Sequence, residues 1–241
     1  MTEPASVPVA PTASLWEDFI DIFTSPSFVF RRREHSGFGM PLLVLTALFG
    51  VLIFGTKPLV QPAIDAETTR AFAKVKKAHP EITAEQMSKQ QAMGDKLGPV
   101  FITIAIPIMA MLTGLVLCLA GKMFSSTQTP SQGIMVATYA FFTKILGLVA
   151  AALIGLVSSP DHLNGMARLT VGVGALFDPE TTSPVLMALV TRLDVFTIWE
   201  TILLAIGLQI TGKVSKSNSY IVAAIVWFIG ALPGLLGALR N

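Results

Sequence analysis

Two ionisable residues lie inside apolar stretches of the sequence, where a charge is costly. Lys144 interrupts an apolar run over 134–157, and Glu200 lies within another over 192–211. Ionisable groups in membrane-spanning helices usually face the bundle interior or an aqueous path, so such residues point to helix pairing or to transport. At about 1.5 Å per residue, Lys144 lies about 15 Å from one end of its run and Glu200 about 12 Å from the opposite end of its own. Both then fall near the middle of a hydrocarbon core about 30 Å thick.

The residues that share a helical face with each charge favour close helix contact. The face of Lys144 carries small residues, which let helices approach closely: Gly147, Ala151 and Gly155. The face of Glu200 carries small or hydroxyl-bearing residues: Thr197, Gly207 and Thr211. Each charge therefore occupies the part of its helix that is best suited to pack against another helix.

From depth and face together, we predict a direct or water-bridged interaction between Lys144 and Glu200. Asp194 and Thr197 complete this candidate polar site. Three further residues are candidate secondary partners: Tyr139, Thr143 and Gln209. The alternative is two unrelated polar residues, one reaching toward the membrane surface and one facing a loop.

Motifs for enzyme chemistry are missing from the sequence. It has no His-Glu-x-x-His, no Gly-x-Ser-x-Gly and no Gly-Lys-Ser/Thr phosphate loop. The three histidines (His35, His79 and His162) lack metal-ligand spacing, and Cys118 is the single cysteine. We therefore expect no enzyme activity, no cofactor and no metal.

A second group of residues suggests contact with a membrane surface. In segment 14–36, Trp16, Phe19 and Phe23 recur at helical spacing. The basic residues Arg31, Arg32 and Arg33 follow them. Ser14 and Glu17 form a capping-box pattern that predicts a helix start. Ser25-Pro26 is an N-cap and N1 pair that predicts a second short helix. We interpret the segment as an amphipathic helix that lies on the membrane surface. The alternative is a helix packed on the end of the bundle or on a partner.

Composition indicates that the rest of the chain is surrounded by lipid. The 241 residues are 52% hydrophobic and only 13% charged, whereas soluble proteins carry about 25% charged residues. Mean hydropathy is +0.67. The net charge of +2 is too small to argue for nucleic acid as a partner. Residues 1–13 lack the basic and apolar regions of a signal peptide, and we expect a disordered tail there.

The predicted fold is an all-α polytopic membrane bundle, because the long apolar runs do not alternate in polarity as barrel strands would. The 37–241 region contains five candidate transmembrane helices: 38–56, 98–121, 134–157, 192–211 and 219–239. A polar loop over 57–97 is expected to form a helical hairpin, with helices over 64–78 and 84–96 split at His79-Pro80. A short interfacial helix is expected over 184–191.

Charge near the membrane gives a weak indication of orientation. With the N-terminus inside, Arg31 to Arg33, Lys122, Lys213 and Lys216 are cytoplasmic, but the seven basic residues of the 57–97 loop then lie outside. We favour a cytoplasmic N-terminus because the three arginines precede the first helix, which usually dominates. An odd number of spans then places the C-terminus outside.

The C-terminal part of the chain resembles the Yip domain family (Ypt-interacting protein), and in particular its bacterial members. The resemblance lies in residues 194–229, with Phe196-Thr197-Ile198-Trp199, then Leu203 to Leu208, a short basic turn and Trp227. Residues 23–30 (FTSPSFVF) resemble the family's pre-membrane segment. The resemblance implies five transmembrane helices, a cytosolic N-terminus and a C-terminus on the far side. It also implies an integral protein of a bacterial cytoplasmic membrane.

Two functional hypotheses follow. Eukaryotic members of that family act in vesicle traffic and bind Rab-type GTPases, but their long acidic N-terminal domain is missing here, so Rab binding does not carry over. The leading hypothesis is a membrane scaffold or adaptor that binds the bilayer, other membrane proteins or further copies of itself. The alternative is a small transporter or channel that uses Lys144 and Glu200. A transporter often shows several polar residues along a path and an inverted repeat, and the sequence shows one charge pair and no repeat.

Overall fold

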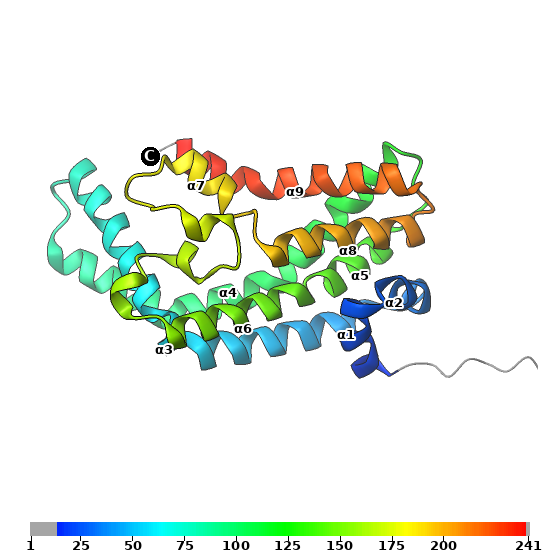
Figure 1. Cartoon of the computed structure of the whole chain (residues 1–241), viewed down its shortest axis with the longest axis horizontal. Helices are drawn as coiled ribbons and strands as arrows, with labels where there is room; N and C mark the ends of the chain where they lie inside the picture. Colours follow the sequence, from blue (N-terminus) through cyan, green and yellow to red (C-terminus); the bar gives the residue numbers. More distant parts are fainter. Residues whose placement is uncertain (1–13, 240–241) are drawn as a thin grey trace, which may run out of the picture.

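The computed structural model describes residues 14–239, which form a bundle of helices along one long axis (Figure 1). Four helices are long and apolar enough to cross a membrane: α3 (Gly39–Ala78), α4 (Ala84–Lys122), the continuous stretch Pro130–Val157, and α9 (Lys216–Leu239). A shorter apolar helix, α8 (Val195–Thr211), has 17 residues, about 25 Å at 1.5 Å per residue. The chain is therefore an α-helical membrane bundle with four candidate spans, and a fifth complete span stays a prediction.

The polar hairpin after the first span is built differently from the sequence prediction. Helix α3 has 40 residues and α4 has 39, each about 60 Å long and far longer than the hydrocarbon core. The expected turn is present, because α3 ends at Ala78 and α4 begins at Ala84 behind a Thr83–Gln86 capping box. The span limits at 56 and 98 stay predictions, but the helix breaks expected at 57–63 and at 97 are absent. Both helices continue unbroken into the polar segment, and α3 accommodates Pro58 and Pro62 inside it.

Contacts between the two helices lie beside this continuous stretch. The Lys57 ammonium donates to the Asp95 carbonyl at 2.5 Å, and the Gln61 amide donates to the Asp95 carboxylate at 3.3 Å. Pro58 and Pro62 each remove one backbone hydrogen bond from α3. The contacts of Lys57 and Gln61 with α4 stabilise the same part of the helix. The end of the apolar run at 56 suggested a break, whereas α3 is continuous there and contacts α4 through Lys57.

The third span consists of two helices in line, α5 (Pro130–Ala140) and α6 (Phe142–Val157), which meet at Phe141. It begins earlier than the predicted 134, because Thr129 and Gln132 form a capping box at the start of α5. Figure 1 shows α5 and α6 running on from each other along the bundle. The junction places Lys144 in the first turn of α6.

A folded connection precedes α8 and shortens it. It contains three single 3-10 turns, η1 (Pro160–His162), η2 (Met166–Leu169) and η3 (Val173–Leu176), and the short helix α7 (Pro184–Val190). An antiparallel bridge joins Gly172 to Asp194, with flanking backbone hydrogen bonds of 3.0 Å. Residues 191 and 192 form a turn and the bridge holds Asp194 in extended structure, so α8 begins at Val195 rather than at the predicted 192. Helix α7 lies close to the predicted 184–191 helix and packs on α9.

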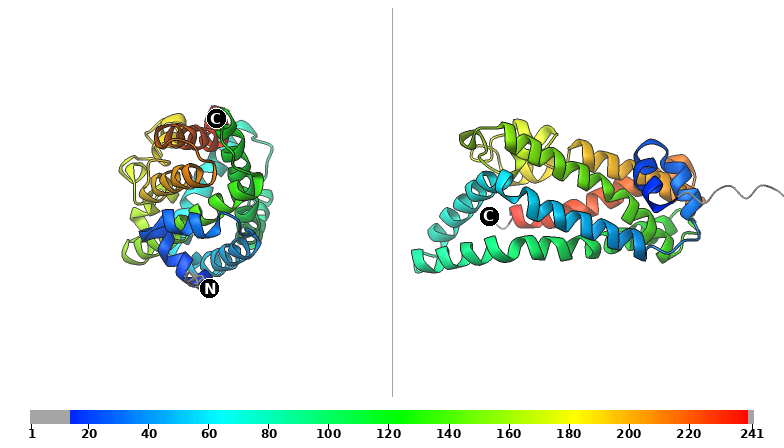
Figure 2. Two further views of the ribbon diagram at one scale, coloured as in Figure 1. Left: turned by 90° about the vertical axis from the view of Figure 1, so that its right-hand side faces the viewer. Right: turned by 90° about the horizontal axis from the view of Figure 1, so that it is seen from below.

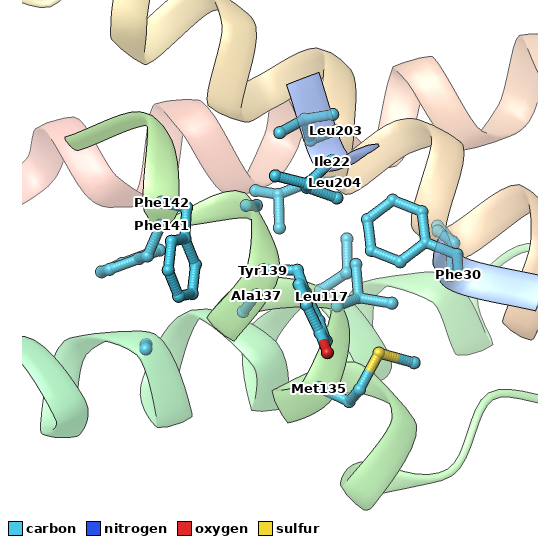
Figure 3. Packing of buried hydrophobic residues seen from close by; sticks show 14 of the residues in the cluster. Ile22, Phe30, Leu117, Met135, Ala137, Tyr139, Phe141, Phe142, Leu203 and Leu204 are labelled. Carbon is cyan, nitrogen blue, oxygen red and sulfur yellow. The ribbon is translucent and has the colours of Figure 1, made fainter. Parts of the chain in front are cut away.

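The N-terminal segment forms two short helices, α1 (Leu15–Thr24) and α2 (Pro26–Arg33), at one end of the bundle. Figure 2 (left) shows them lying across that end. Ile22, Val29 and Phe30 have no exposed surface and belong to the main core. Figure 3 shows Ile22 and Phe30 beside Leu203, Leu204 and Tyr139 of the bundle. The apolar face of the segment packs on the bundle end, which is the alternative left open by the sequence, and contact of its other face with the membrane surface stays a prediction.

Candidate functional site

Lys144 and Glu200 meet between α6 and α8. The Nζ atom of Lys144 lies 2.7 Å from Oε2 of Glu200, with side chains 33% and 11% exposed. The contact is ionic, and its angles fall outside hydrogen-bond geometry. The Lys144 ammonium also lies 5.3 Å from the centre of the Phe141 ring, a favourable position for a cation. The structure thus brings the two predicted charges into direct contact.

Each partner is positioned by the start of its own helix. Lys144 lies in the first turn of α6, just after the Phe141 junction, and Glu200 lies in the second turn of α8, just after the bridged connection. Gly147 faces Phe196 of α8, where an added Cβ would lie 3.3 Å from the ring. The Gly147 side of α6 can therefore approach α8 closely, which brings the charges together.

The other small residues named from the sequence serve different neighbours. An added Cβ on Gly207 of α8 would lie 2.2 Å from Val136, so this glycine sets the approach of α8 to α5. An added Cβ on Gly155 would lie 2.3 Å from the Leu59 carbonyl, so the far end of α6 approaches α3 instead. The small-residue face of α6 is therefore divided between two helices.

Asp194 and Thr197 lie beside the ion pair without joining it. Asp194 is the N-cap of α8, and its Oδ1 accepts from the backbone N–H groups of Phe196 and Thr197 at 3.0 and 3.1 Å. Both residues line a cavity of about 240 Å³ whose wall also includes Lys144 but not Glu200. The rest of that wall is mainly apolar, from α3, α6, α8 and the residue 166–171 connection.

The three candidate secondary partners do not contact the pair. The Thr143 hydroxyl donates to the carbonyl of Ala140 at 2.9 Å, and the Tyr139 hydroxyl donates to Asp18 at 3.2 Å. The Gln209 side chain makes no hydrogen bond among the residues described by the structure. The site is thus a compact ion pair rather than a chain of polar groups.

Arg192 is a charged neighbour that the sequence prediction did not single out. Its guanidinium donates to the carbonyls of Gly230 and Trp227 on α9, at 3.1 and 3.3 Å, and lies 5.5 Å from the Trp227 ring centre. Gly230 leaves room for it, since an added Cβ would lie 3.0 Å from Arg192 Nη2. Arg192 therefore ties the connection before α8 to the middle of α9. The sequence signal that could have identified Arg192 is its position as the charged first residue of the predicted 192–211 span.

A second charged cluster joins the N-terminal helices to the bundle, and we call these residues (Asp18, Arg32, Arg33 and Tyr139) the Asp18 latch. The Asp18 side chain has no exposed surface. It accepts from Arg32 Nη2 at 2.7 Å and from Arg33 Nε, and its third partner is the Tyr139 hydroxyl on α5. Phe19 stacks on Phe142 with ring centres 4.5 Å apart. Tyr139 was a weak sequence signal for the latch, because a buried tyrosine hydroxyl usually finds a partner.

The residues predicted to bind the membrane surface differ from one another in burial. Phe19 is buried in the core, Phe23 packs partly against it, and Trp16 is exposed. Burial alone would lower the pKa of the Arg32 guanidinium, but its hydrogen bond to Asp21 and the charge of Asp18 raise that pKa above its ordinary value. Arg31 is exposed.

Two polar contacts extend the attachment beyond the latch. The Lys213 ammonium in the turn between α8 and α9 lies 2.6 Å from the Glu34 carboxylate, and the Gln132 amide of α5 donates to the Glu34 carbonyl at 3.1 Å. Among the described residues, no group of three histidine, cysteine or acidic side chains could hold a metal ion. The charged side chains at this end of the bundle thus mainly connect its helices.

The four long apolar helices define an α-helical integral membrane protein. The chain belongs to the Yip1 domain family, whose model matches residues 20–237. It is similar to "Membrane protein YknW" of Bacillus subtilis (strain 168), with 25% identity over 242 residues that cover 95% of this chain and 94% of that protein. No solved structure matches the chain significantly. The family match confirms the resemblance that the sequence suggested.

Proposed function

We propose that the protein is a non-enzymatic membrane scaffold or adaptor. In this proposal a closed helical bundle holds the α1–α2 pair as a fixed platform at one membrane surface. The observation that carries the proposal is the Asp18 latch, in which a fully buried carboxylate joins α1 to both α2 and α5. A buried charge that loses its partners is strongly destabilising. The latch therefore favours a platform with one defined orientation.

The placement of basic residues supports a cytoplasmic platform. The end of the bundle that carries α1 and α2 also contains the end of α4 and the α8–α9 turn (Figure 1). Its basic residues outside the latch are Arg31, Lys122, Lys213 and Lys216. Basic residues close to short connections favour the cytoplasmic side. We therefore propose a bacterial cytoplasmic membrane with α1–α2 inside and the α3–α4 hairpin outside.

Transport is the weaker alternative. Lys144 and Glu200 are in direct contact with each other, and the cavity beside them is lined by Lys144 but not by Glu200. Its wall is mainly apolar, whereas a transport path needs several polar groups. Within the described residues the pair is better suited to holding α6 against α8.

The test uses full-length protein in native membranes with a photo-crosslinking residue at the exposed position Ser27. We expect wild-type protein to give defined crosslinked products and Asp18→Asn to lose them, because the platform loses its orientation. Asp21→Asn is the matched control, since Asp21 binds Arg32 but not the bundle. Tyr139→Phe is the milder variant if Asp18→Asn does not fold.

Two results would contradict the scaffold. One is an unchanged crosslinking pattern in both Asp18→Asn and Tyr139→Phe, which would show that the latched platform is not required. The other is solute flux in proteoliposomes that disappears in the Lys144→Met/Glu200→Met double variant, which would favour transport.

A further inference from the structure

The three consecutive arginines at the end of α2 have different partners. Arg32 and Arg33 bind the buried Asp18 carboxylate, and Arg32 also binds Asp21 at 2.7 Å. Arg31 is exposed, and no hydrogen bond or ion pair involves its side chain within the described part of the chain. A guanidinium has five N–H donors and no acceptor. Arg31 is therefore open to an external anion.

Large apolar side chains accompany Arg31 on the outer surfaces of α1 and α2. Trp16 and Ile20, four residues apart on α1, are 67% and 68% exposed, and Phe28 on α2 is 68% exposed. Residues three or four apart share a helical face, so Phe28 lies beside Arg31. Exposed aromatic and aliphatic residues next to a cation are typical of helices in the membrane interface.

Lipid-facing residues of the bundle extend to the same end. Met40 and Leu43, in the first turns of α3, are 59% and 62% exposed. Leu119 and Met123, at the end of α4, are 69% and 75% exposed. Figure 2 (right) shows α1 and α2 beside these helix ends. Because exposed apolar side chains of a spanning helix face lipid, the membrane interface lies close to the level of the α1–α2 pair.

We infer that the outer surface of the α1–α2 pair binds an anionic bilayer surface. Arg31 contacts lipid phosphates, while Trp16, Ile20 and Phe28 enter the interfacial layer. Arg32 and Arg33 serve the Asp18 latch and contribute little to lipid preference. The inference rests on the proposed platform function and names the partner of that platform.

The experiment uses full-length protein in which Trp199→Phe and Trp227→Phe leave Trp16 as the only tryptophan. The protein is placed in nanodiscs of phosphatidylcholine alone or mixed equally with phosphatidylglycerol. We expect Trp16 to be quenched by bromine atoms near the top of the lipid chains and protected from aqueous iodide. Energy transfer to labelled phosphatidylglycerol should show enrichment of this lipid around the platform.

Removing the charge of Arg31 isolates the phosphate contact. Arg31→Ala should lower the preference for phosphatidylglycerol about fivefold, the effect of one basic residue at such a surface. Arg31→Lys should keep most of it, and Lys76→Ala, an exposed charge on the distant hairpin, should leave it unchanged. If the tryptophan variants do not fold, an environment-sensitive dye on Ile20→Cys in a Cys118→Ala background gives the same reading.

Three outcomes would overturn the inference. These are iodide quenching of Trp16 in phosphatidylglycerol nanodiscs, an unchanged lipid preference in Arg31→Ala, and full competition by soluble glycerol phosphate, which would indicate a site for free anions. If lipid preference is absent while crosslinking at Ser27 still depends on Asp18, the platform serves a protein partner and the scaffold proposal stands. Loss of both would remove the scaffold as well.

Discussion

The Tyr139 hydroxyl on α5 donates a 3.2 Å hydrogen bond to the Asp18 carboxylate on α1, a contact between residues 121 positions apart. It joins an N-terminal helix, which has only ten residues, to the middle of the core. A short helix is marginal alone and depends on tertiary packing. This contact and the Phe19–Phe142 stacking therefore hold α1 in place on the bundle.

Tyr139→Phe should destabilise this attachment while leaving the ring packing intact. A hydrogen bond to a charged group contributes about 1.5–3 kcal/mol, and the loss should appear as earlier protease cleavage around Arg31 before the bundle unfolds. Tyr220→Phe is the matched control, because the Tyr220 hydroxyl makes no hydrogen bond among the described residues. Equal cleavage in the two variants would mean that the phenol does not secure α1.

Asp18→Asn should destabilise the protein more than Asp21→Asn. Asp18 is fully buried against two guanidinium groups, whereas the Asp21 side chain is 35% exposed and pairs with Arg32. Breaking a buried pair from one side costs about 3–5 kcal/mol, while an exposed pair contributes about 0–1 kcal/mol. Unfolding in detergent, followed by circular dichroism, measures both. A larger loss in Asp21→Asn would contradict the assignment of the buried carboxylate.

Lys144→Met and Glu200→Gln should each destabilise the protein in detergent. A lone charge near the bilayer centre costs about 2.5–3.5 kcal/mol, and the Gln variant should lose less because its amide can still hydrogen-bond. Lys144→Met/Glu200→Met should recover part of the loss, because neither charge remains unpaired. A double-mutant cycle of unfolding free energies measures the coupling. Strictly additive losses would show that the 2.7 Å contact contributes nothing.

Sequence periodicity predicted the helices well where apolar runs and capping signals agree. The Thr83 and Ser14 capping boxes are present, and the turn at His79-Pro80 lies where expected. Helix ends that depend on tertiary contacts were missed. Lys57 contacts α4 where α3 continues beyond its predicted end at 56. The Gly172–Asp194 bridge lies just before α8, which begins later than predicted.

The charged residues show the same limit. Depth and face were enough to pair Lys144 with Glu200, because both lie on regular helices whose geometry is known in advance. The Asp18 latch depends on the turn at Ser25, which folds α2 back so that Arg32 and Arg33 reach Asp18. Ser25-Pro26 predicts a break between two short helices but not the angle between them, so all three arginines looked equivalent in the sequence.

Close helix contact gives the last prediction. Gly114 on α4 and Gly133 on α5 face each other, and an added Cβ on Gly114 would lie 2.5 Å from the Ile134 Cα. On Gly133 it would lie 2.4 Å from the Gly114 carbonyl. Because these neighbours are backbone atoms, Gly114→Ala must push the helices apart, which costs at least the ~1–3 kcal/mol of an overpacked core.

Gly55→Ala is the matched control, since among the described residues no atom beyond the local helix backbone lies within 4 Å of an added Cβ at this position inside α3. Alanine is the better helix former by about 1 kcal/mol, so this variant should be neutral or slightly stabilising. Melting temperatures in one detergent compare the two substitutions, which add the same methyl group. If Gly114→Ala melted with or above Gly55→Ala, α4 and α5 would not pack backbone against backbone, and their glycines would not set the distance between these two helices.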